Sequence, residues 1–399
     1  MISRWLERRI KQRIKSQNQS FFAACAPGLE DVVALELGAL GLVGVEKFGG
    51  GVEFSGKLEA MYLANLNLRS ASRVWLRVDS FRSGSLEDVF RRVKALRWET
   101  LIWPRTPLNI QVYVRDSRLR SGTQVKRAVA DGIWARVKEV EAEQPDYTGV
   151  IRSLGRIDHE QRILVTVENN RFRISLDSSG EHLHKRGYRL ETAKAPMRET
   201  LVAGVILASG WNGGEPFLDP MCGAGTSPIE AALIANGVPP GQKRSFSFEN
   251  WPAYSEPAWR FMTQRAEGVD LKTPPELIVG RDRNAGAMRI SKANAARAGV
   301  EQAVTFQRAD FFSPNDFRLG AHPGHIFINP PYGKRIEEPG KEGLFYKRLG
   351  QRLKRNYTGW KVAMIVPYDA DTEALGMKPF KRILLDNGGI KVFALFMKA

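Results

Sequence analysis

The sequence predicts an α/β protein whose carboxy-terminal part is an open domain with a seven-stranded, mostly parallel sheet that finishes in an antiparallel hairpin. Smaller α+β units are expected to precede it. Two observations carry this prediction. Apolar strands alternate with helical patterns after about residue 176, which is typical of parallel sheets. The 399 residues also exceed what one hydrophobic core usually organises, so two or three domains are expected.

The first segment, residues 1–18, is expected to be a basic amphipathic helix. Its apolar residues recur at helical spacing among Arg and Lys residues, and they are Ile2, Trp5, Leu6, Ile10 and Ile14. Four roles stay open for this helix: packing on its own protein, contact with RNA, contact with a membrane, and service as a mitochondrial presequence.

Two α+β units are expected next, over residues 19–80 and 81–175. In the first, the pattern predicts a strand from Phe21, a helix that opens near Pro27 and stops at Gly41, and then a strand, a helical pattern and a strand at residues 50–56, 58–75 and 75–81. In the second, it predicts a helix, a strand, a helix and a hairpin at residues 86–96, 108–116, 123–140 and 162–178. The hairpin is expected to turn at Asn169 and Asn170, since Asn tolerates the left-handed conformation of tight turns.

The open α/β domain is expected over residues 176–399. Its apolar strands each end near a polar residue and lie at residues 216–220, 276–282, 304–310, 325–331 and 361–367. A hairpin at residues 382–397 turns at Asp-Asn-Gly-Gly and supplies the last two strands. An aromatic and proline-rich insertion, residues 250–261, separates the first two strands.

Composition favours a nucleic-acid partner. Lys and Arg outnumber Asp and Glu by 60 to 43, which gives a formal charge of +17 and indicates a polyanion, with an anionic membrane surface as the alternative. Two cysteines are too few for a disulfide framework or a four-cysteine zinc site, so we expect no metal and a reducing, cytoplasmic setting. No apolar run is long enough for a signal peptide or a membrane span, and neither is expected.

A ligand-binding turn is predicted where the first strand of the open domain ends. Asp219 closes that strand, Gly223 and Gly225 follow in a tight turn, and a helix begins after them. Glycines let the backbone approach a ligand that faces the helix amino terminus. A plain strand-to-helix turn is the alternative for this motif alone. The phosphate-binding Gly-Lys-Ser/Thr and the third glycine of the dinucleotide fingerprint are both missing, which disfavours ATP and NAD.

Two further strand ends carry acids. Asp282 could accept hydrogen bonds from the ribose hydroxyls of an adenosyl ligand, provided that the aromatic insertion is looped out of the sheet. Asp310 could accept a hydrogen bond from an adenine amino group while Phe311 packs on the ring. Either aspartate taken singly could instead cap a helix.

The decisive motif is Asn329-Pro330-Pro331-Tyr332 at the end of the fourth strand. The Asn329 side-chain carbonyl and the Pro330 backbone carbonyl can both accept N–H bonds from an exocyclic amino group. They would hold its nitrogen in line with a methyl donor. The two prolines stiffen the loop, and Tyr332 offers a face for an unstacked base. A proline-rich turn is the alternative, but the neighbouring motifs at successive strand ends argue against it.

These residues resemble a known family. DPMCGAGTSPIEAA, GRDRNAGAMRISKANAARAG, QRADFF and NPPYGKRI look like successive motifs of class I, Rossmann-like methyltransferases that act on amino groups. HKRGYR, PMRETL, FFAACAPGLEDVVALEL, GGVEFSG and SRLRSGTQVKRAVADGI resemble the upstream parts of THUMP-containing RNA guanine-N2 methyltransferases, over about residues 20–399. The likeness is strongest to the bacterial enzymes that make N2-methylguanosine in large-subunit ribosomal RNA. The arm before Asn18 has no counterpart, and the second methyltransferase domain of some relatives is absent.

The resemblance implies a ferredoxin-like segment at residues 19–80, a THUMP RNA-binding domain at 81–175 and a methyltransferase domain at 176–399. S-adenosylmethionine would be the cofactor. Its expected contacts are Arg198, Glu199, Thr200, Asp219, Pro220, Cys222, Gly223, Gly225, Thr226, Asp282, Arg283, Asp310 and Phe311. Asn329, Pro330, Pro331 and Tyr332 would hold the guanine.

RNA is the expected partner, and a monomer is expected. The basic residues that could bind its phosphates flank a predicted helix start and are Arg118, Arg120, Lys126 and Arg127. His182 and His184 have no companion at metal-ligand spacing and are interpreted as structural or RNA-facing. Cys222 is interpreted as a turn residue, since amino-group methylation needs no covalent adduct.

Three hypotheses follow for the function. The first is an enzyme that methylates guanine N2 in structured RNA, with 23S ribosomal RNA as the expected substrate. The second is an adenine-N6 methyltransferase on RNA or DNA, because the same tetrapeptide serves any planar amino nitrogen. The third is a non-catalytic RNA-binding or ribosome-assembly protein.

Overall fold

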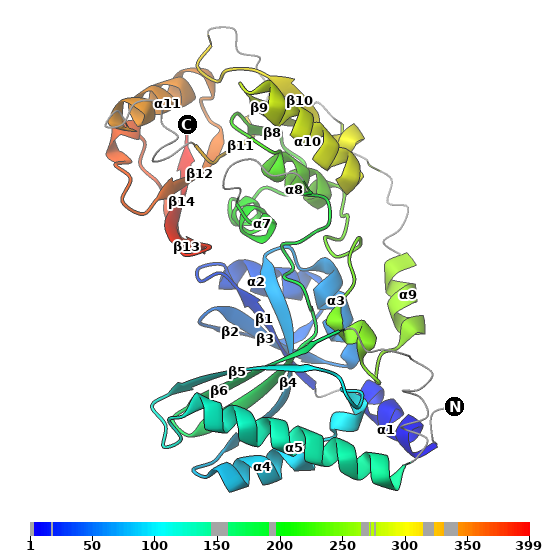
Figure 1. The fold of residues 1–399 in the computed structure, drawn as a ribbon. Coiled ribbons are helices and arrows are strands. Elements are labelled where there is room, and N and C mark those ends of the chain that lie inside the picture. The colour runs from blue at the N-terminus through cyan, green and yellow to red at the C-terminus, as the bar shows by residue number, and fades with distance from the viewer. Residues whose placement is uncertain are drawn as a thin grey trace.

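The computed structural model describes residues 4–16, 19–144, 159–190, 197–264, 271, 273–274, 277–313, 323–330 and 342–399. These residues form two seven-stranded sheets, one in each half of the chain, which lie at opposite ends of the molecule (Figure 1). The predicted fold class is confirmed. No helix in the described ranges is long and apolar enough to cross a membrane.

The amino-terminal sheet has the strand order β2-β3-β1-β4-β7-β6-β5. Antiparallel pairing of β4 with β7 joins the two predicted α+β units into one sheet, and only β5 and β6 pair in parallel. The strands are β1 (Gln19–Cys25), β2 (Val43–Phe48), β3 (Gly51–Gly56), β4 (Ala71–Arg82), β5 (Leu108–Arg115), β6 (Gln161–Glu168) and β7 (Arg171–Asp177).

One face of this sheet is buried throughout, and the other is buried only near the start of β4 and the end of β7, around Trp75 and Asp177. The register aligns Phe21, Leu76 and Leu176, which are all buried, and the row continues through Ile163 to Ile110. Side chains of the covering helices join this core, and the helices are α2 (Glu30–Ala39), α3 (Leu58–Asn67), α4 (Leu86–Ala95) and α5 (Gly122–Glu143). The alternate positions of β6 point the other way and stay partly exposed, which leaves an uncovered face.

The hairpins form where the turn chemistry predicts. Asn169 and Asn170 have positive φ angles of 51° and 60° between β6 and β7. Gly388 and Gly389, at 69° and 92°, connect β13 (Lys381–Asn387) to β14 (Ile390–Lys398). The Asp386 carboxylate accepts the Gly389 N–H at 2.7 Å and so stabilises this second turn.

Three elements differ from the sequence prediction. Strand β2 was not predicted, because nearly all its side chains are exposed and give no alternation. β4 begins at Ala71, within the stretch predicted as helical. Helix α7 (Glu199–Ala208) was not recognised either, because its first eight residues are buried and so it shows no amphipathic pattern.

The carboxy-terminal sheet has the order β10-β9-β8-β11-β12-β14-β13. Pairing is parallel from β10 to β12 and antiparallel in the last two ladders. The remaining strands are β8 (Phe217–Asp219), β9 (Ile278–Asp282), β10 (Thr305–Arg308), β11 (His325–Ile328) and β12 (Lys361–Pro367), and the helices between them include α8 (Thr226–Ala235), α10 (Ala285–Ala298) and α11 (Glu342–Asn356).

The aromatic insertion leaves the carboxy-terminal sheet and packs on the amino-terminal half, beside α3 (Figure 1). In the structure the insertion extends beyond the predicted residues 250–261 to residues 247–264, and it contains the short helix η2 (Ser247–Asn250) and helix α9 (Glu256–Gln264). The Phe248 ring stacks on Tyr62 of α3 at a centroid distance of 4.5 Å, and Trp259 meets Phe248 edge-on at 5.1 Å. The insertion is therefore looped out of the sheet, as the position of Asp282 in the sequence required.

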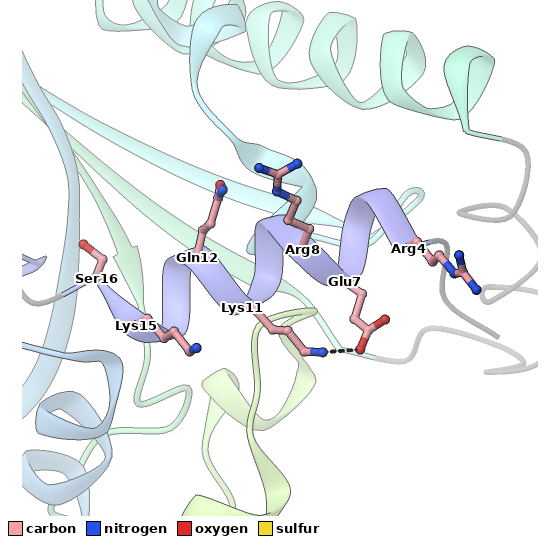
Figure 2. Close-up of a pocket in the computed structure, with 7 residues that line it drawn as sticks. All are labelled: Arg4, Glu7, Arg8, Lys11, Gln12, Lys15 and Ser16. Atoms are coloured by element: carbon pink, nitrogen blue, oxygen red, sulfur yellow. Dashed lines mark hydrogen bonds and ion pairs between the residues drawn. The ribbon is translucent and has the colours of Figure 1, made fainter.

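The first segment forms helix α1 (Arg4–Lys15), as predicted. Its apolar face packs on its own protein, since Leu6 and Ile10 are buried, and so this face is not available to a membrane. The short helix η1 (Trp98–Thr100) receives it: Arg9 pairs with the buried Glu99, and Arg13 donates to the Thr100 hydroxyl at 2.6 Å. Figure 2 shows the outer face, where a shallow surface groove of about 480 Å³ is lined by Arg4, Glu7, Arg8, Lys11, Gln12, Lys15 and Ser16.

Candidate active site

The predicted glycine turn lies between β8 and α8. Gly223 and Gly225 have positive φ angles of 55° and 81°, and α8 begins immediately after Gly225. A Cβ atom on Gly225 would lie 2.9 Å from the Cβ of Ser291 and 3.0 Å from the Phe306 ring. Both the backbone conformation and the space therefore require glycine at this position. The loop leaves the amino terminus of α8 facing the carboxyl edge of the sheet.

Asp282 joins the glycine turn despite the long insertion between them. Its Oδ2 accepts the Gly223 N–H at 3.0 Å, and its Oδ1 accepts the Asn284 N–H at 2.9 Å. Ser291 and Asn294 of α10 donate to the carbonyls of Gly223 and Ala224 at 2.9 and 3.0 Å. The ends of β8 and β9 thus form one rigid cradle of backbone groups.

Asp219 holds the same turn from its other side. Its carboxylate accepts the Met221 N–H at 2.9 Å and the Ser227 hydroxyl, and it is buried. Burial raises the pKa of Asp219 to about 7, and the nearby Asp282 charge adds to this. The side chain therefore fixes the loop's shape from beneath.

Cys222 is a turn residue in the structure. Its N–H donates to the Arg281 carbonyl at 2.8 Å, and its thiol is buried. Burial raises the pKa of this thiol well above its usual value, with Asp219 and Asp282 contributing in the same direction. A thiol that stays protonated is a poor nucleophile, in keeping with the sequence interpretation.

At the third strand end, the two predicted residues differ in exposure: Asp310 is exposed and Phe311 is buried. The Asp310 carboxylate accepts the Phe312 N–H at 2.9 Å in a turn just past β10. The Phe311 ring is buried and stacks against Tyr357 at 5.9 Å, inside the apolar core that includes Leu218 and Ile328. In this structure Phe311 thus supports the edge of the sheet from within.

The tetrapeptide that begins at Asn329 follows β11, which pairs with β8 on one side and β12 on the other. This pairing places Asn329 at the same edge of the sheet as Asp219. The Asn329 Oδ1 atom is buried and has no hydrogen-bond partner among the described residues. A buried acceptor without a partner is costly, so it indicates a site for a donor. Pro331 and Tyr332 lie outside the described residues.

The remaining predicted cofactor residues lie at the ends of the same elements. Glu199 and Thr200 are buried in the first turn of α7, and Glu199 pairs with Arg189 at 3.0 Å. Burial raises the pKa of Glu199 to about 7. Arg198 precedes α7 and is exposed. Pro220 and Thr226 flank the glycine turn, and the Arg283 carbonyl accepts from Arg308 at 3.1 Å.

The predicted RNA-binding residues lie in the other half of the molecule. All four are exposed around the start of α5, and they are Arg118, Arg120, Lys126 and Arg127. The backbone N–H of Arg118 donates to Asn170 Oδ1 at 2.7 Å, which fixes this loop to the turn between β6 and β7. The structure therefore does not bring these residues and Asn329 together, and an RNA would have to reach from one half to the other.

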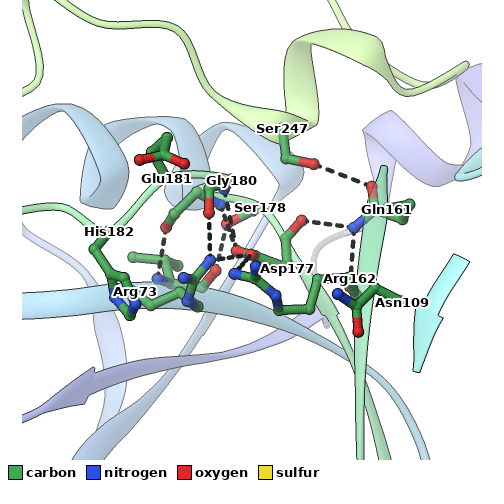
Figure 3. Close-up of polar contacts among 12 residues, drawn as sticks. Arg73, Asn109, Gln161, Arg162, Asp177, Ser178, Gly180, Glu181, His182 and Ser247 are labelled. Atoms are coloured by element: carbon green, nitrogen blue, oxygen red, sulfur yellow. Dashed lines mark hydrogen bonds and ion pairs between the residues drawn. The ribbon is translucent and has the colours of Figure 1, made fainter. Parts of the chain in front are cut away.

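A polar network around Gln161 and Asp177, which was not predicted, links the insertion to the amino-terminal sheet (Figure 3). Arg73 and Asp177 form a buried ion pair between β4 and β7. Gln161 of β6 accepts from the Ser247 hydroxyl at 3.1 Å and from Trp251 Nε1 at 2.7 Å, and both donors belong to the insertion. Polar residues scattered over distant strands carry no motif, so only the fold reveals this network.

The HKRGYR segment has a structural role in the described chain. Tyr188 donates to Glu230 of α8 at 2.9 Å, and Arg186 lies 3.5 Å from the same carboxylate. The rings of His182 and His184 stack at 5.4 Å. Burial, aided by nearby arginines, lowers the pKa of each imidazole to about 4, so both are neutral at physiological pH.

The fold and the site together define a class I methyltransferase domain. It follows an amino-terminal half of a type that binds RNA. The family models agree with this description: residues 186–394 match the RMKL-like methyltransferase domain, residues 20–75 the RlmL ferredoxin-like domain and residues 83–152 the THUMP domain. The chain belongs to the family of THUMP-containing, RlmL-like RNA methyltransferases.

Individual relatives support this membership. The chain is 33% identical to the Bacillus subtilis protein named "Putative RNA methyltransferase YpsC", with 92% of this chain and 93% of the relative covered. It is 31% identical to the ribosomal RNA large subunit methyltransferase K/L of Cellvibrio japonicus over 93% of this chain, but it spans only 50% of that relative.

Solved structures are similar over nearly the whole chain. A Listeria monocytogenes protein described as a predicted N6-adenine-specific DNA methylase is 31% identical, with a TM-score of 0.83 and coverage of 97% of this chain and 98% of that one. A methyltransferase structure described as a complex with SAH, the demethylated cofactor product, is 27% identical, with a TM-score of 0.80 and coverage of 96% and 99%.

Proposed function

We propose that this protein transfers a methyl group from S-adenosylmethionine to the exocyclic N2 amino group of a guanosine in structured RNA, with 23S ribosomal RNA as the substrate. The observation that carries this proposal is the buried Oδ1 of Asn329, which has no hydrogen-bond partner in the described part of the chain and lies at the same sheet edge as the glycine cradle. The family membership and the net charge of +17 support RNA as the partner.

The cradle suits the methyl donor. Gly223 and Gly225 open the backbone above the amino terminus of α8, and Asp282 lies where ribose hydroxyls could donate to it. Bound there, S-adenosylmethionine would supply an electrophilic methyl group. The predicted contacts at Asp219, Asp310 and the start of α7 belong to the same proposal, with Asp219 acting through the turn that it holds.

Asn329 acts on the amino group of the substrate. The lone pair of an exocyclic amino group is delocalised into the ring, so the nitrogen is a weak nucleophile. An N–H bond accepted by Asn329 Oδ1, with a second accepted by the Pro330 carbonyl, orients that nitrogen and stabilises the positive charge that develops during attack.

Substitution of Asn329 tests the proposal. We expect Asn329→Ala to lower kcat for tritium transfer from labelled S-adenosylmethionine to unmodified ribosomal RNA by roughly 10²–10³-fold, the usual loss when one preorganised group is removed. Methyl-donor binding, measured by calorimetry, should be unchanged. Full activity in this variant would overturn the assigned role of Asn329.

A second candidate function is methylation of adenine N6, which the description of the Listeria monocytogenes structure favours. Nucleoside chromatography of the digested product separates the candidates. Label in N2-methylguanosine supports the proposal. Label in N6-methyladenosine would show that adenine is the target, with the same role for Asn329. Absence of methyl-donor binding would favour the third reading, a non-catalytic RNA-binding or ribosome-assembly protein.

A further inference from the structure

Three arginines meet on the uncovered face of the amino-terminal sheet. Arg82 of β4 and Arg171 of β7 are direct partners across their ladder, and Arg173 lies two positions along β7 on the same face. They line a surface pocket of about 250 Å³, together with Thr166, Glu168 and Asn169. The pocket therefore combines three guanidinium groups with a hydroxyl and an amide.

This arrangement is unfavourable without a ligand. Like charges directly opposite each other destabilise a sheet, and within the part of the chain that the structure describes no carboxylate lies within ion-pair distance of these three arginines. The pocket's one acid, Glu168, is the cross-strand neighbour of Arg171 and also lies 3.7 Å from Arg115, so a single carboxylate stands against several arginines and the pocket keeps a net positive charge. An anion in the pocket would relieve the repulsion, and arginine forks match phosphate oxygens in geometry.

The pocket continues into the surface predicted to bind RNA. A Cβ atom placed on Gly84 would lie 3.6 Å from Arg118 Nη1, so the Arg118 side chain reaches toward the strand end that carries Arg82. Asn170 accepts the Arg118 N–H at 2.7 Å, and its own N–H donates to Ser117 at 3.0 Å. These bonds hold the loop, the turn and the pocket in a fixed relation.

We propose that the pocket formed by Arg82, Arg171 and Arg173 binds phosphodiester groups of the RNA substrate and extends the RNA-binding surface from the start of α5 onto the open face of the sheet. This inference rests on the proposed function in taking RNA as the partner. The contacts are to the backbone, so they position the RNA and carry no sequence information.

The test measures equilibrium binding of a large-subunit ribosomal RNA transcript to the full chain, without S-adenosylmethionine, over a series of salt concentrations. For Arg171→Gln/Arg173→Gln we expect binding to weaken by roughly tenfold or more at physiological salt. We also expect the slope of log K against log salt to fall in magnitude by about 1–2, because each phosphate contact releases counterions. The charge-preserving Arg171→Lys/Arg173→Lys should retain most of the slope.

A matched control removes two charges elsewhere. Arg91→Gln/Lys138→Gln changes exposed positions on α4 and α5, which cover the other face, and should leave the slope unchanged. A wild-type slope in Arg171→Gln/Arg173→Gln would overturn the inference while leaving the proposed function intact. Conversely, the wild-type protein could methylate no RNA nucleoside while Arg171→Gln/Arg173→Gln still reduces the salt slope of RNA binding. That result would refute the proposed function and support phosphate binding by the pocket.

Discussion

Single residues at the strand ends divide between shaping the site and contacting ligands. Asn329 offers an acceptor that no described residue occupies, whereas both carboxylate oxygens of Asp219 accept from Met221 and Ser227 within its own loop. The sequence pattern placed both residues at the same sheet edge. It could not show that the Asp219 carboxylate is used within its own loop, because a carboxylate that accepts from its own turn and one that accepts from a ligand have the same spacing.

The raised pKa of Asp219 makes a pH-dependent contribution to stability. Its pKa is about 7 when folded, against 3.8 for the unperturbed group, so between these values the folded state keeps a proton that the unfolded state has lost. Stability from this residue therefore falls as pH rises through that window, by at most about 1.4 kcal/mol per pH unit, and levels off above it.

Asp219→Asn imitates the protonated side chain at every pH, with the Ser227 hydroxyl able to accept from the new amide. We expect the melting temperature of this variant, relative to wild type, to increase from pH 5 to about pH 7 and then to level off, measured by thermal unfolding without cofactor. A difference that does not vary with pH would show that Asp219 is ionised in the native state.

At the scale of elements, the strands of the carboxy-terminal sheet were all predicted because each is a short apolar run bounded by turn residues. The elements missed lack such a signal: β2 is exposed and α7 is apolar on all sides. The partner of α1 was also unpredictable. Its amphipathic pattern gives a buried face but does not say that Glu99, far along the chain, completes that face.

The Glu99 ion pairs fasten α1 to the body of the protein. Glu99 is fully buried and accepts from Arg9 and from Arg136 Nε at 3.1 Å. Burial alone would raise the pKa of Glu99, but the bonds from Arg136 and Arg9 outweigh it and the pKa is lowered. We expect Glu99→Gln to reduce the free energy of unfolding in urea by about 3 kcal/mol, because Arg9 loses its carboxylate partner and Arg136 keeps only Glu139, at 3.6 Å.

The matched control for this ion pair is Glu7→Gln. Glu7 pairs with Lys11 one helical turn away on the exposed side of the same helix. Surface pairs of this kind are screened by water, so no measurable loss is expected. Equal losses in both variants would mean that α1 is stabilised by its own helix pattern and not by docking.

At the scale of the whole molecule, the insertion from the catalytic half fixes the RNA-binding half in place. Gln161 of β6 is the meeting point, since it accepts from Trp251 and Ser247 at one oxygen and donates to the Asp177 carbonyl at 2.9 Å. The distance between the predicted RNA-binding residues and Asn329 therefore depends in part on side chains that touch neither, together with contacts such as that of Arg69 with the Val238 carbonyl at 2.8 Å.

Trp251→Phe tests this connection, because it removes the indole N–H from Gln161 and part of the packed ring. We expect a loss of about 1–3 kcal/mol in unfolding free energy. Hydrogen exchange should become faster in β6 and in η2 together, while β11 and β12 keep their protection. Tyr254→Phe serves as the control, since it removes a hydroxyl from the same insertion and has no described hydrogen bond to β6. Faster exchange in η2 alone would show that the two halves are held by other contacts.

The pairing of β4 with β7 also determines how this protein can be divided. A cut after residue 82 would separate two segments that match different family models, yet it would strip the partner from both strands along seven aligned residue pairs. Strands with bare edges recruit strands from other molecules, so each half expressed alone is a candidate for aggregation. A fragment that keeps all seven strands of the amino-terminal sheet paired must therefore span residues 19–177, across the boundary between the two family models.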